Sequence, residues 1–186
     1  EAYTDIISLH ENVQDSKQVQ KFFPIKAYDL DEEIVKVANS GYFNSSVNER
    51  LMLQINAEDY EKYFDLSKTD KNLCIPNEQS ASFLRKTQKT IKAKEILTKN
   101  VKFKQGDMFK KITEINDSSN TMLFCRNILG YFENNKIEEF IKLAQKALKS
   151  GSLMAIGDHD SVLFNIKECM EEHGFKEIFK NLFKKL

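Results

Sequence analysis

Three strand-like stretches of the sequence end in polar residues that could bind a ligand. Asp29, Asp107 and the pair Arg126-Asn127 each follow a run of apolar or alternating residues. In open parallel sheets, ligands bind in the crevice outside the carboxyl ends of the strands. We therefore expect these four side chains to face such a crevice.

The two aspartates suggest nucleoside chemistry. A carboxylate at the end of a strand can accept both hydroxyls of a ribose, which is the role we assign to Asp29. Asp31 is better suited to cap the next helix. No third carboxylate accompanies Asp29 and Asp31, so no metal site is predicted. Asp107 could meet an adenine amino group while Met108 packs on the ring. A turn role for Asp107 after Gly106 fits the spacing almost as well.

The histidines and cysteines offer less chemistry. His159 lies near the predicted crevice in Gly157-Asp158-His159-Asp160, where an ordinary loop role is the simpler interpretation. His10 is expected on a surface helix and His173 by a helix end. The sequence contains no GxSxG, HExxH or Walker motif. The three cysteines are widely spaced and form no CxxC pair, which argues against zinc and disulfides and for a reducing cytoplasm.

Helices and strands alternate in the elements that must position these residues. Helices are expected at 3–13, 31–41, 57–64, 81–97, 135–149 and 161–173, and strands at 22–30, 101–107, 121–127, 152–158 and, as a pair turning near Asn181, 175–186. This order predicts an α/β fold with a mostly parallel sheet flanked by helices and an antiparallel C-terminal strand. The apolar run 121–127 is expected to be covered on both faces.

Composition limits the class of protein. The 186 residues suit a single domain over 1–186, and 41% apolar with 30% charged residues is a globular balance. Lys+Arg and Asp+Glu are both 28, so no nucleic-acid or anionic-membrane partner is indicated, and the lysines of 81–97 are interpreted as a solvated face. We see no bilayer-length apolar run and no signal peptide.

Four segments together resemble the chemotaxis-receptor methyltransferases, the CheR family. They are AYDLDEEIVKVANSGYF, AEDYEKYF, VKFKQGDMF and LFCRNILGYF, in the family's order and approximate spacing. The family signature is a strand ending Phe-Cys-Arg-Asn, an apolar pair and then Tyr-Phe, here Phe124-Cys125-Arg126-Asn127 followed by Tyr131-Phe132. The resemblance implies a Rossmann-like fold and S-adenosylmethionine as cofactor, with S-adenosylhomocysteine as product.

The resemblance also implies roles for individual residues. Asp29, with Leu30 beside it, would bind the ribose, and Asp107 and Met108 would flank the adenine. The family more often has Asn at the position of Asp107.

The implied catalytic region contains Arg126 and Tyr131. Arg126 and Asn127 would contact the methionine part of the cofactor, and Tyr131 would lie by the transferred methyl. The expected acceptor is a glutamate side chain in the cytoplasmic part of a chemoreceptor. Glutamate has a pKa of about 4.3 and is already a nucleophile at pH 7, so no general base is required. Alignment of the two reactants would be the main task of the enzyme.

The chain departs from the family in three places. The family has a strand with a G-x-G-E loop before the segment resembling 1–7, so we expect that strand and loop upstream of this chain, which would be a fragment of a longer protein or the product of a degraded gene. The family's helical N-terminal domain is likewise not in these residues. Residues 44–100 are expected to form a divergent insertion, longer, more basic and partly helical, where the family has a small β-subdomain that can grip a receptor tail. Gly157-Asp158-His159-Asp160 replaces the family's G-x-S-E.

Two other functions are open on the sequence. One is a catalytically inactive methyltransferase-like module that binds a partner. The other is a methyltransferase with a different acceptor, which the altered 157–160 loop and the unusual insertion would explain.

Overall fold

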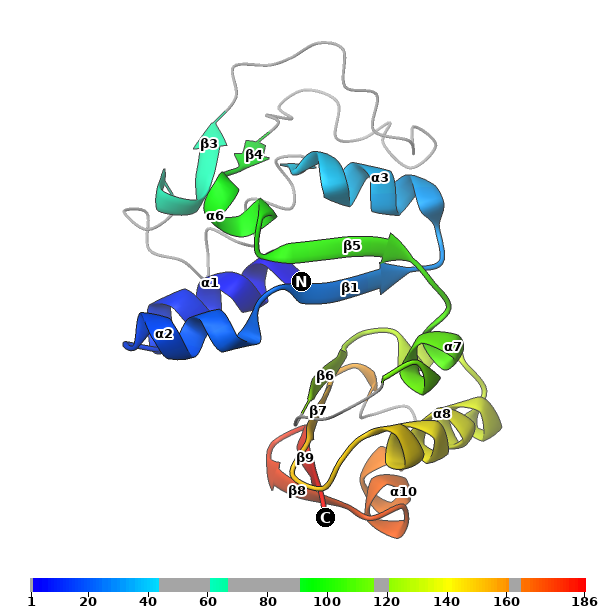
Figure 1. Cartoon of the computed structure of the whole chain (residues 1–186). Helices are drawn as coiled ribbons and strands as arrows, with labels where there is room; N and C mark the ends of the chain where they lie inside the picture. The colour runs from blue at the N-terminus through cyan, green and yellow to red at the C-terminus, as the bar shows by residue number, and fades with distance from the viewer. Residues whose placement is uncertain (1, 44–60, 67–90, 116–120, 161–164) are drawn as a thin grey trace. The chain divides into compact units, whose positions relative to one another are not determined.

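Figure 1 shows a computed structural model of the protein, which describes residues 2–43, 61–66, 91–115, 121–160 and 165–186. The chain forms two compact units, one ending at Gly106 and the other beginning at Asp107, and each has its own hydrophobic core. Helices alternate with strands, and each unit contains a parallel strand pair. The predicted α/β class is therefore confirmed. A single Rossmann-like sheet in one domain stays a prediction.

The first unit begins with helices and ends with a strand. Its elements are α1 (Ala2–Asn12), α2 (Ser16–Val19), the 3-10 turn η1 (Gln20–Phe22), β1 (Ile25–Asp29), α3 (Glu32–Ser40), β2 (Tyr42–Phe43), β3 (Phe64–Leu66), β4 (Ile91–Ala93), α6 (Glu95–Thr98) and β5 (Val101–Gln105).

The strands β1 and β5 form a parallel pair (Figure 1). Their register runs from Ile25 opposite Val101 to Asp29 opposite Gln105. Ile25 and Ala27 of β1 pack against the core of this unit, which includes Ile6 of α1. This pairing places Asp29 at the carboxyl end of β1, as the sequence predicts.

Local signals set the bounds of α3. Asp31 caps its N-terminus, where Oδ1 accepts the backbone N–H groups of Glu33 at 2.8 Å and Ile34 at 3.4 Å. Gly41 follows the last turn with φ of 72°, a left-handed conformation that glycine adopts without strain. The predicted helix over 31–41 is confirmed.

A small antiparallel sheet corrects the prediction for part of the insertion. Its strand order is β2-β4-β3, and β4 lies within the segment 81–97 that we expected to be one basic helix. Ile91 and Ala93 are buried while Lys92 is exposed, so the strand period of two prevails over helix propensity through pairing with distant strands. The helix expected over 57–64 is also shorter at its end, since Phe64 begins β3. The rest of these segments lies outside the described residues.

The second unit is a four-stranded sheet with helices. Its elements are α7 (Met108–Thr113), β6 (Met122–Cys125), the 3-10 turn η3 (Leu129–Tyr131), α8 (Asn134–Ala147), β7 (Leu153–Ile156), α10 (Ile166–Glu172), β8 (Phe175–Phe179) and β9 (Leu182–Lys185).

The strand order in this sheet is β6-β7-β9-β8. β6 and β7 are parallel, whereas β9 runs antiparallel to both β7 and β8. Asn181 has φ of 59° in the turn between β8 and β9. The predicted antiparallel C-terminal pair with a turn at Asn181 is confirmed.

The strand β6 differs from the prediction in its burial. It lies at one edge of the sheet, and Met122 and Phe124 are 40% and 39% exposed. The expectation that both faces are covered was therefore wrong within this unit. An apolar run cannot by itself distinguish a central strand from an edge strand.

The helix α8 supplies one wall of the second core. Ile137, Phe140, Ile141 and Ala144 recur at helical spacing and are buried, as the sequence predicts.

In the described part of the chain, no helix is both long and apolar enough to cross a membrane.

Candidate functional site

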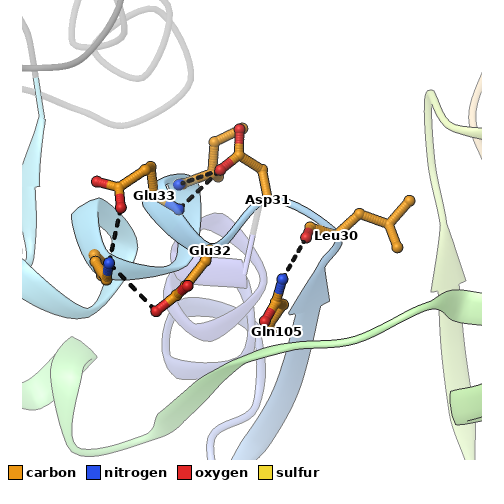
Figure 2. A network of polar contacts seen from close by, with 7 residues as sticks. Leu30, Asp31, Glu32, Glu33 and Gln105 are labelled. Carbon is orange, nitrogen blue, oxygen red and sulfur yellow. Dashed lines mark hydrogen bonds and ion pairs between the residues drawn. The ribbon is translucent and has the colours of Figure 1, made fainter.

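The site residues of the first unit lie at the end of β1. Asp29 is half-buried, and its Oδ1 accepts the backbone N–H of Asp31 at 2.9 Å. Among the described residues, Oδ2 of Asp29 accepts no hydrogen bond, so this oxygen can receive a hydroxyl of a ligand. Asp31 instead uses its carboxylate on the first turn of α3 (Figure 2). The cap role of Asp31 agrees with the prediction, and the ribose role of Asp29 stays a prediction.

Leu30 has an exposed side chain and a fixed backbone. The side chain is 63% exposed and points away from Asp31 and Gln105 in Figure 2. Its carbonyl accepts the amide N–H of Gln105 at 2.9 Å, which joins the ends of β1 and β5. Leu30 thus offers an apolar surface beside Asp29 on a positioned backbone.

Asp107 is a helix cap. Its Oδ1 accepts the backbone N–H groups of Phe109 at 2.7 Å and Lys110 at 3.3 Å, at the start of α7. Met108 is half-buried and packs against the core of the second unit. Asp107 therefore has a local backbone role, the alternative to ligand binding that its spacing allowed. The adenine role of Asp107 and Met108 stays a prediction.

Arg126 and Asn127 stand where β6 ends. Both side chains are exposed, and Asn127 has φ of 56°, in the left-handed region that asparagine tolerates better than most residues. The turn η3 follows and presents Tyr131, which is 86% exposed. The chain thus displays a cation, an amide and a phenol within six successive residues.

The loop after β7 lies close to this group. Asp158 accepts a hydrogen bond from Asn181 at 2.6 Å and pairs with Lys180 at 3.0 Å. The Lys180 hydrogen bond is the main cause that holds the pKa of Asp158 below its ordinary value, and the nearby charge of Arg126 adds to it. His159 is exposed. The structure therefore brings the 157–160 loop next to Arg126.

Sequence reasoning assigned no role to the two buried residues at the ends of this loop, Gly157 and Asp160. Asp160 is 2% exposed, and its Oδ1 accepts the backbone N–H of Gly130 at 3.0 Å. A Cβ on Gly157 would lie 2.6 Å from the backbone nitrogen of Asn127 and 2.8 Å from Oδ2 of Asp160. The acidic residue and the glycine were visible in the sequence, but nothing there indicated a partner thirty residues away.

Cys125 is an inert neighbour of this group. Burial raises the pKa of its thiol to about 12, and the charge of Asp160 contributes. The thiol is therefore protonated at neutral pH and is not a nucleophile.

The first unit contains a histidine whose environment differs from the prediction. His10 is not simply on a surface helix, because its ring is half-buried against Phe23 at 5.5 Å and Tyr63 at 6.4 Å between ring centroids. Burial lowers its pKa. Its place in the aromatic core suits a packing role.

Each unit, taken by itself, carries donors or acceptors that suit one part of the adenosyl cofactor that the resemblance implies. An acceptor oxygen on Asp29 suits ribose hydroxyls, and the guanidinium of Arg126 with the amide of Asn127 suits a carboxylate. Within the described ranges, no three His, Cys, Asp or Glu side chains are grouped so that they could hold a metal ion.

Comparison with known proteins gives one result. Residues 68–178 match the family model described as CheR methyltransferase, SAM binding domain. A search of curated proteins found no match. The matched range includes Arg126, Asn127 and Tyr131 but not Asp29, and it covers more than half of the 186 residues. The chain belongs to the CheR methyltransferase family and is an S-adenosylmethionine-dependent methyltransferase.

Proposed function

We propose that the protein methylates a glutamate side chain of a chemoreceptor-type protein in the cytoplasm, forming a glutamate methyl ester. The observation that carries this proposal is the exposed group Arg126, Asn127 and Tyr131 at the end of β6, inside the range that matches the family. The family name and a donor set suited to the cofactor support a methyl transfer to protein.

Each part of the cofactor has residues of the chain suited to hold it. Oδ2 of Asp29 would accept the ribose hydroxyls, while Asp107 and Met108 would lie by the adenine. Arg126 and Asn127 would bind the charged end of the methionine part. Bound S-adenosylmethionine supplies a methyl group activated by its sulfonium.

The residues of the chain would act by orientation. A glutamate acceptor has a pKa of about 4.3, so it arrives as a carboxylate and no proton need be removed. Tyr131, exposed on its turn, would lie against the acceptor and limit its approach to the methyl. Arg126 would keep the negative end of the cofactor away from the acceptor carboxylate.

Cofactor binding is tested by calorimetric titration of S-adenosylhomocysteine into the chain. Saturable binding that is lost in Asp29→Ala and kept in Asp31→Ala supports the proposal. Both variants remove a carboxylate next to α3, so the second controls for a general effect on the helix. Absence of binding by the wild type contradicts the proposed cofactor site in this chain.

The acceptor is tested with labelled S-adenosylmethionine and receptor-derived peptides. We expect label in a peptide that contains glutamate and none in the matched glutamine peptide. A carboxyl methyl ester releases methanol in mild alkali, whereas N-methyl groups do not. Label that is stable to alkali would contradict a glutamate acceptor.

A different acceptor is the second candidate, and one observation favours it. Asp158 places a carboxylate near Arg126, where it would repel an acidic acceptor. Its ion pair with Lys180 offsets part of that charge. A panel of neutral and basic acceptor peptides separates the two candidates, since only this second one predicts label there.

A further inference from the structure

The second unit contains a buried carboxylate that is only half satisfied. Asp160 is 2% exposed, and Oδ1 accepts the N–H of Gly130 at 3.0 Å. Oδ2 is also buried and has no hydrogen-bond partner among the described residues. A buried carboxylate normally needs several donors, so this arrangement is unfavourable for stability taken alone.

The hydrogen bond of Asp160 reaches the turn that carries the site. Gly130 lies within η3, between Asn127 and Tyr131. The bond connects two loops, the one after β6 and the one after β7, which are neighbours because these strands are parallel. A hydrogen bond from N–H to a carboxylate is stronger than one to a neutral acceptor, so it restrains the turn effectively.

The packing at Gly157 adds a second restraint. The space above its Cα is bounded by the backbone nitrogen of Asn127 at 2.6 Å, by Oδ1 of Asn127 at 2.8 Å and by Oδ2 of Asp160 at 2.8 Å, all measured from the point where a Cβ would lie. Only a residue without a Cβ leaves room for this approach. Asp160, Gly157 and Asn127 thus form one close-packed group, in which buried Asp160 and Gly157 lie against exposed Asn127.

We propose that Asp160 is a positioning residue for methyl transfer, which fixes the Asn127–Tyr131 turn through the N–H of Gly130 and so orients Asn127 and Tyr131. The inference rests on the proposed function, because these are the residues proposed to hold the cofactor and face the acceptor. Asp160 itself is buried and would touch neither the cofactor nor the acceptor.

The test compares three variants at a temperature where all are folded. Asp160→Ala removes the acceptor for Gly130, and Asp160→Asn keeps an oxygen that can accept the same bond. Ser152→Ala is the matched control, because buried Ser152 accepts the N–H of Thr121 at 3.1 Å near the opposite end of β6. Two quantities are measured, the affinity for S-adenosylhomocysteine and the hydrogen-exchange rate of the Gly130 amide.

We expect Asp160→Ala to bind at least about 10-fold more weakly, since a hydrogen bond to a charged group is lost. Its Gly130 amide should exchange faster. Asp160→Asn should bind S-adenosylhomocysteine within about 3-fold of the wild type and keep the Gly130 amide protected from exchange. The amide oxygen of asparagine can still accept this hydrogen bond, so only the contribution of the negative charge is lost. Ser152→Ala should lose stability while the affinity and the Gly130 exchange rate remain unchanged.

Two results would overturn the inference. Unchanged affinity and exchange in Asp160→Ala would show that the turn does not depend on this carboxylate. Equal losses of affinity in Asp160→Ala and Ser152→Ala would show a general effect of stability. A wild type that does not bind contradicts the proposed function and the cofactor part of the inference together, whereas Gly130 exchange in the variants still decides whether Asp160 holds the turn.

Discussion

Asp29 and Asp31 are joined by a hydrogen bond of 2.9 Å, in which the backbone N–H of Asp31 donates to Oδ1 of Asp29. The two carboxylates, two residues apart, thus have different functions. Asp29 restrains the turn through Oδ1, which leaves Oδ2 for the ligand role proposed above, and Asp31 caps α3.

This division predicts opposite effects of two alanine variants. Asp31→Ala should lower the free energy of unfolding by about 1 kcal/mol, the usual loss of an N-cap, and leave the affinity for S-adenosylhomocysteine unchanged. Asp29→Ala should abolish binding with a smaller loss of stability. Urea unfolding and calorimetric titration of both variants check this, and equal effects on affinity would refute the division.

Gly157 should not tolerate a side chain. In Gly157→Ala the new Cβ would lie 2.6 Å from the backbone nitrogen of Asn127, so the backbone must move. Overpacking of this kind costs about 1–3 kcal/mol, and we expect cofactor affinity to fall with it.

Gly174→Ala is the control for that change. Gly174 has φ of 79°, and no atom lies within 4 Å of the position that a Cβ would take, so its cost should come from backbone conformation alone. We expect a loss of stability without loss of affinity. A Gly157→Ala protein that binds as well as Gly174→Ala would contradict the close packing at Asn127.

Glu11 should make stability depend on pH. Lys62 donates to its Oε1 at 2.7 Å and Tyr63 donates to the same oxygen. The Lys62 hydrogen bond is the largest cause that lowers the pKa of Glu11 below the ordinary 4.5, and the Tyr63 bond comes next. A folded-state pKa below the unfolded value stabilises the protein above the unfolded pKa, and this contribution is lost as pH falls through the folded pKa.

Glu11→Gln therefore should be less stable than the wild type at pH 7, and the difference should shrink in acid. Chemical unfolding of both proteins between neutral pH and about pH 3 measures it. A difference that stays constant over this range would mean that the ionisation of Glu11 contributes nothing.

Cys125 should resist alkylation in the folded protein. Burial raises the pKa of its thiol to about 12, so little thiolate exists at pH 8 and the sulfur is shielded. Mass mapping after treatment with iodoacetamide should find Cys125 unmodified in buffer and modified in urea. Rapid labelling in buffer would show that the end of β6 opens readily.

Local signals were readable from the sequence, and contacts between distant segments were not. The helix over 31–41 was predicted because Asp31 and Gly41 mark its ends by their own chemistry. The strand β4 was missed because Ile91-Lys92-Ala93 is short and lies among helix formers, and its pairing with β2 and β3 decides its conformation.

The candidate site shows the same difference between local signals, which the sequence reveals, and contacts between distant residues, which it does not. Arg126 and Asn127 were identified from their position after a strand-like run, which the structure reproduces. The role of Asp160 depends on its contact with Gly130, and no sequence pattern encodes that pairing. The exposure of Phe124 likewise could not be predicted from the apolar sequence of β6.

The strand order of the second unit has a consequence for synthesis on the ribosome. β9 is the last of the four strands to be translated, yet it lies between β7 and β8. Until Lys185 has left the exit tunnel, β7 cannot pair with β9, and β8 has no strand of this sheet to pair with. The nascent second unit therefore has unpaired strands during synthesis, and the pairing of its sheet can be completed only after β9 has emerged.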